Sequence, residues 1–103
     1  MTQPAMLDYP FTCDAAPVQV EGTLEGHPFY FRARGDQWTF SLAEEPGLDP
    51  VYLDSSESAA GRGYFLTARY GAPGSFAASY MPPAEARDLI DECVRRYRVD
   101  RSA

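Results

Sequence analysis

The sequence contains no lysine, and all nine of its basic residues are arginines. This excludes Schiff-base and lysine-nucleophile chemistry, because no other side chain carries a primary amine that can lose its proton. One histidine and two cysteines are too few for a four-ligand zinc site, so we expect no metal and no cofactor. No apolar run approaches the roughly 20 residues that span a bilayer, and residues 1–6 do not resemble a secretory signal. We therefore expect a cytoplasmic protein that does not enter a membrane.

The length and composition favour one small folded domain. The chain has 103 residues, of which 45% are hydrophobic and 23% are charged, which is typical of a globular protein. Residues 1–16 carry prolines at positions 4 and 10 and show little periodicity, so we expect a poorly ordered N-terminal arm. The single domain is then expected at 17–103.

The charge is negative and unevenly distributed. Fifteen acids against nine arginines give a net charge of −6. Residues 1–61 hold ten acids and two arginines, whereas 62–103 hold five acids and seven arginines. An acidic domain repels the phosphate backbone, so we expect no direct binding of nucleic acid and favour a protein partner with a basic surface.

Alternation of apolar and polar residues predicts consecutive antiparallel strands. It runs over Val18–Leu24, 29–34 and 37–42, and short turns rich in glycine separate these segments. A fourth strand is predicted from residue 63 to residue 70 after a turn-rich acidic segment, 44–62, in which only 51–53 have strand character. A short fifth strand is expected at 76–81.

A C-terminal amphipathic helix is predicted from Pro83 to about Arg98. Its apolar residues recur at spacings of three and four and form one stripe, which includes Cys93. The sequence therefore predicts an α+β fold in which an antiparallel sheet of four to five strands has this helix packed on one face. Cys93 is expected to be a buried apolar side chain, and the role of Cys13 is open.

No pattern in the sequence is typical of an active site. His27 is the single imidazole, but no spacing rule brings a nucleophile to it, and the serines at 55, 56 and 58 lack the context of a nucleophile elbow. We therefore predict no catalytic residue and a protein that is not an enzyme. The open alternative is a small enzyme that depends on His27.

Two surfaces are candidates for binding a partner. The sheet face opposite the helix is expected to present tyrosine and arginine, the residue types enriched at binding hot spots, although an ordinary solvated face explains them equally well. The acidic segment, together with Asp36, is expected to imitate a row of phosphates, unless its charge serves solubility alone. The ten candidate partner-binding residues are Tyr30, Arg32, Arg34, Asp36, Glu44, Glu45, Asp49, Asp54, Glu57 and Arg69.

Over about residues 20–43 the chain resembles small proteins carried by phages and mobile elements. The resemblance rests on 26–34 (GHPFYFRAR) and 38–40 (WTF). The acidic, single-domain profile without catalytic residues is similar to that of phage anti-CRISPR proteins. This resemblance implies an inhibitor that binds a larger nucleoprotein complex stoichiometrically and blocks DNA binding by a CRISPR effector. The alternative hypothesis is a small module that binds peptide or nucleic acid through the arginine and tyrosine sheet face; a homodimer fits both, because edge strands can pair across a two-fold axis.

Overall fold

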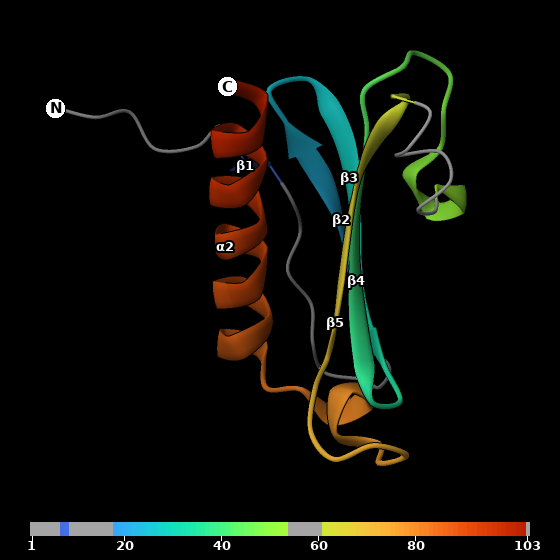
Figure 1. The fold of residues 1–103 in the computed structure, drawn as a ribbon, viewed down its shortest axis with the longest axis vertical. Coiled ribbons are helices and arrows are strands. Elements are labelled where there is room, and N and C mark those ends of the chain that lie inside the picture. Colours follow the sequence, from blue (N-terminus) through green and yellow to red (C-terminus); the bar gives the residue numbers. More distant parts are fainter. Residues whose placement is uncertain (1–6, 9–17, 54–60, 103) are drawn as a thin grey trace, which may run out of the picture.

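The fold is an α+β arrangement of one antiparallel sheet and one long C-terminal helix. The computed structural model describes residues 7–8, 18–53 and 61–102. In Figure 1 the helix α2 runs along one side of the sheet, and a short 3-10 helix, η1, lies on the other side. The elements are β1 (Leu7–Asp8), β2 (Val18–Leu24), β3 (His27–Arg34), β4 (Gln37–Ala43), η1 (Pro50–Tyr52), β5 (Gly63–Arg69), η2 (Ala77–Tyr80) and α2 (Pro83–Ser102).

The sheet is a meander in which each strand pairs with its neighbour in the chain. The strand order is β1-β2-β3-β4-β5, and every pairing is antiparallel. Two-residue turns join β2 to β3 and β3 to β4, and positive φ angles at Glu25, Gly26 and Gly35 give these turns the twist of a tight hairpin. The predicted meander and fourth strand are confirmed, and β3 begins two residues earlier than expected, at His27.

The core lies between the sheet and α2. The inward residues of β2 to β5 form one hydrophobic cluster with the buried stripe of the helix. Phe29 and Phe40 stack with their ring centroids 5.5 Å apart, and Phe31 and Trp38 do so at 5.9 Å. The helical members of the cluster are Ala86, Ile90, Cys93, Val94 and Tyr97, with Leu89 packed against it.

Helix α2 is longer than the sequence predicted. It begins at Pro83 as expected but ends at Ser102, about one turn beyond Arg98. The apolar stripe stops at Tyr97, so periodicity alone gave no reason to extend it. Polar contacts hold the added turn, because Asp100 accepts a hydrogen bond from Tyr64 of β5 and Arg101 pairs with Glu44 after β4.

Two short segments predicted as strands are 3-10 helices instead. Residues 77–80 form η2, in which Ala78 is buried and Tyr80 is exposed, and η2 docks on the β3–β4 turn because Gly35 N donates to Ser79 Oγ. The expectation that 51–53 have strand character was wrong. The segment Pro50–Tyr52 forms η1, because Asp49 caps it by accepting a hydrogen bond from Val51 N. In the predicted N-terminal arm, Leu7–Asp8 pair with the end of β2, and the other arm residues lie outside the described part.

Candidate functional site

The sheet face turned away from α2 carries a row of polar and basic side chains. Tyr30, Arg32 and Arg34 alternate along β3 with the buried Phe29, Phe31 and Ala33. The register places Arg32 between Gln19 and Thr39, and it places Gln37 between Arg34 and Arg69. Candidate residues of β3 and β5 therefore share one surface, here called the outer face.

The outer face is covered at one end and open at the other. Near the start of β3 and the end of β4, at the top of Figure 1, η1 lies over the sheet, and buried Ser41 donates to Pro50 O at 2.6 Å. Toward the β3–β4 turn the face is open and forms a shallow hollow of about 190 Å³. This hollow is lined by Arg32, Arg34, Gln37 and Thr39.

Arg32 and Arg34 differ from most other arginines of the chain in having no carboxylate partner among the described residues. The Nε atom of Arg32 is buried and makes no hydrogen bond. The Nε atom of Arg98 is buried without a hydrogen bond in the same way, although Arg98 pairs with Glu25. The arginines that do pair with a carboxylate are Arg62, Arg69, Arg95, Arg98 and Arg101.

The acidic candidate Glu44 is engaged within the protein. Its carboxylate accepts two hydrogen bonds from Arg101, at 2.8 and 2.7 Å, and one from the Tyr97 hydroxyl at 2.7 Å. The hydrogen bonds from Arg101 lower the pKa of Glu44, against the opposing effect of its partial burial. The Arg101 guanidinium also lies over the rings of Tyr64 and Tyr97, so Glu44 secures the end of α2 to the sheet.

The other described acidic candidates are also engaged internally, and they lie at two ends of β4. Glu45 accepts from Arg62 at 2.6 Å, and Asp49 caps η1. Asp36 accepts from Gly74 N at 2.7 Å and from Arg69 at 3.4 Å. Because Asp36 precedes β4 and Glu44 follows it, the structure places Asp36 at the opposite end of the strand from the acidic segment. Asp54 and Glu57 lie outside the described residues.

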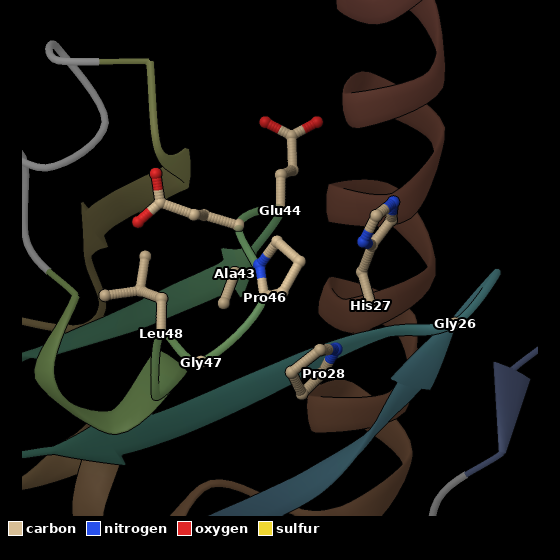
Figure 2. Close-up of a pocket in the computed structure, with 9 residues that line it drawn as sticks. Gly26, His27, Pro28, Ala43, Glu44, Pro46, Gly47 and Leu48 are labelled. Atoms are coloured by element: carbon tan, nitrogen blue, oxygen red, sulfur yellow. The ribbon is translucent and has the colours of Figure 1, made fainter.

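A second hollow surrounds His27. Figure 2 shows it between the β2–β3 turn and residues 43–48. Glu25, two residues before His27, accepts from Arg98 at 2.5 Å, and the carboxylates that share the hollow with His27 are those of Glu44 and Glu45. The lining residues are Gly26, His27, Pro28, Ala43, Glu44, Glu45, Pro46, Gly47 and Leu48, which include no hydroxyl or thiol. The hollow therefore offers no nucleophile for His27 to activate.

Two features of the outer face were not predicted from the sequence. Gln37 lines the hollow and lies between Arg34 and Arg69 in the sheet. Its alternation with the inward Trp38 and Phe40 was a signal that could have placed it on the outer face. The cover supplied by η1 had no such signal, because it depends on a hydrogen bond between Ser41 and Pro50. Within the described part of the chain, no three side chains of the metal-binding types come together as a metal site.

Compared with known proteins, the chain matches no protein-family model, no curated protein and no solved structure. None of the described helices combines the length and the apolar character needed to cross a membrane.

Proposed function

We propose that the protein is a non-enzymatic binding module whose outer face binds an acidic segment of a protein partner. The observation that carries the proposal is that Arg32 and Arg34 line an open hollow and have no carboxylate partner in the described part of the chain. Five other arginines are neutralised by acids of the same chain. Arg32 and Arg34 are neighbours on one open surface, and no carboxylate of the described residues neutralises either of them.

The spacing of the two arginines fits carboxylates on an extended segment. Arg32 and Arg34 are two residues apart on one strand, so their side chains leave the same face about 7 Å apart. Alternate side chains of an extended peptide repeat at the same distance. Guanidinium groups bind carboxylates with two parallel hydrogen bonds, and Gln37 and Thr39 add neutral hydrogen-bonding groups between them.

The acidic character of the whole chain favours a short acidic peptide over nucleic acid. A net charge of −6 repels a long polyanion at low ionic strength, whereas a segment with two carboxylates meets only the local arginine pair. Single-stranded DNA is therefore expected to bind more weakly than a peptide with alternating glutamates.

Isothermal titration calorimetry with such a glutamate peptide tests the proposal. Changing Arg32 and Arg34 together to Gln should weaken binding at least tenfold, because each charge-assisted hydrogen bond contributes about 1.5–3 kcal/mol. The matched control is the pair Arg95→Gln and Arg96→Gln on the exposed side of α2, which removes the same charge. Equal losses in both variants, or no binding by the unaltered protein, would contradict the proposal, as would tighter binding of single-stranded DNA.

The second candidate is an acidic inhibitor of a larger nucleoprotein complex, such as a phage anti-CRISPR protein. It is supported by the net charge of −6 and by the exposure of Glu45 and Asp49. Its weaker point is that each described acid of this segment already has a partner inside the protein. A pull-down of purified CRISPR effector complexes tests it, and reversal of the charges at Glu45 and Asp49 should abolish any retention.

A further inference from the structure

Strand β5 is an edge of the sheet, and its ladder to β4 fixes which of its backbone groups are free. Glu44 N donates to Arg62 O, and Tyr70 N donates to Asp36 O, so the hydrogen-bonded pairs with β4 involve the even-numbered residues. The N–H and C=O groups of Phe65, Thr67 and Arg69 therefore point away from the sheet. Among the described residues none makes a hydrogen bond to these outward backbone groups; the carbonyl of Gly63, just before them, accepts from Arg101.

This edge lacks the devices that usually prevent edge-to-edge pairing. The register with β4 is continuous from Gly63 to Arg69, without a bulge, and the strand contains no proline. Its only charged residue, Arg69, stands at its end and pairs with Asp36. An unprotected edge strand is a template for another strand, so it is expected to have an occupant.

We propose that the occupant is a second copy of this chain, paired antiparallel through β5 with Thr67 opposite its own counterpart. The outward backbone groups of β5 belong to Phe65, Thr67 and Arg69, and Thr67 is the middle residue of this stretch. When Thr67 lies opposite its own counterpart, each of these groups can therefore form a hydrogen bond with the second copy. This register places Phe65 opposite Arg69 of the second copy, where the ring and the guanidinium can form a favourable cation–π pair. It places no like charges opposite each other. On the α2 side it places Leu66 opposite Ala68.

The pairing would join two sheets into one and leave both outer faces on the same side. A two-fold axis through the Thr67 pair runs perpendicular to the sheet, so the arginine hollows of the two copies lie side by side on one surface. This inference does not depend on the ligand of the outer face, because its evidence is the backbone of β5.

Proline at position 67 is the sharpest perturbation. The Thr67 N–H points outward, so Thr67→Pro removes a donor of the proposed interface but no hydrogen bond of the β4–β5 ladder. Thr67→Val is the matched control, because both changes remove the hydrogen bond from the Thr67 hydroxyl to Trp38 O, and only the valine keeps the N–H. Sedimentation velocity over a wide range of concentrations should show a dimer for the unaltered protein and for Thr67→Val, and a monomer for Thr67→Pro.

Amide hydrogen exchange on the unaltered protein tests the same idea without any substitution. The amides of Leu66 and Ala68 should be protected at every concentration, whereas those of Phe65, Thr67 and Arg69 should become protected only as the dimer forms. Each copy carries a charge of −6, so added salt should strengthen the dimer. A protein that stays monomeric, odd-numbered amides that exchange rapidly at the highest concentration, or a dimer that survives Thr67→Pro would overturn the proposal.

Discussion

Replacing Glu44 by glutamine should measure how strongly the end of α2 is held to the sheet. Glu44 follows β4 and binds Arg101 through two hydrogen bonds and Tyr97 through a third. Glutamine has nearly the same shape and keeps one oxygen, which can still accept from the Tyr97 hydroxyl and Arg101 Nε, whereas its NH2 group cannot accept from Arg101 Nη2. The change therefore removes the negative charge and one of the two hydrogen bonds from Arg101.

The expected loss is about 1–2 kcal/mol of unfolding free energy. Hydrogen bonds to a charged group contribute about 1.5–3 kcal/mol, and this value is reduced here because the Arg101 side chain is 42% exposed to solvent. In a domain of this size such a loss lowers the melting temperature by roughly 5–10 °C. Glu45→Gln is the matched control: its salt bridge to Arg62 is exposed on both sides, and its loss should cost about 0.5 kcal/mol or less.

The effect of Glu44→Gln should also depend on pH in a defined direction. Because the folded state lowers the pKa of Glu44 below its usual 4.5, its contribution is complete above the unfolded pKa and is lost as pH falls through the folded pKa. Urea unfolding of both proteins at neutral pH and at a pH well below 4.5 measures the gap, which should close as the pH falls through the lowered pKa of Glu44. Equal losses for Glu44→Gln and Glu45→Gln, or a gap that does not change with pH, would refute the reasoning.

Two further predictions concern the core. Burial raises the pKa of Cys93 to about 12, so in the folded protein iodoacetamide should leave this thiol unmodified at neutral pH, and peptide mass spectrometry should find it alkylated only after denaturation. Gly63→Ala should lower the unfolding free energy by about 1–3 kcal/mol, because the new Cβ would overlap Leu53 Cδ1 and lie 2.5 Å from Leu42 O. Chemical denaturation measures the second effect, and Ala43→Gly, its register neighbour on β4, serves as a control that creates space instead of overlap.

The sequence predicted the parts of the fold that depend on local pattern. Alternation of residues such as Phe29 and Phe31 defined the strands, and the stripe from Ala86 to Tyr97 defined the helix. The errors arose where contacts between distant residues decide the structure. The last turn of α2 is stabilised by hydrogen bonds to Glu44 and Tyr64, and η2 is stabilised by its hydrogen bonds to Gly35. Neither set of contacts has a signature in the local sequence.

The candidate site shows the same division. The phase of β3 was enough to place Tyr30, Arg32 and Arg34 on one face, since side chains alternate along a strand. Which charges are free could not be foreseen, because Glu44 and Arg101 are 57 residues apart in the sequence and meet only in the folded chain. A count of acids and bases therefore overestimated how much negative charge of the acidic segment is available to bind a partner.

The order of elements along the chain has a consequence for synthesis on the ribosome. Strands β2, β3 and β4 are complete by Ala43 and are joined by two-residue turns, so closing them costs little chain entropy and they can pair while the rest is still being made. Their apolar side, with Phe29, Phe31 and Phe40 at its centre, has no cover until α2 emerges. During that interval the nascent chain exposes a wide aromatic surface, so a chaperone that shields the emerging sheet would protect this protein from aggregation.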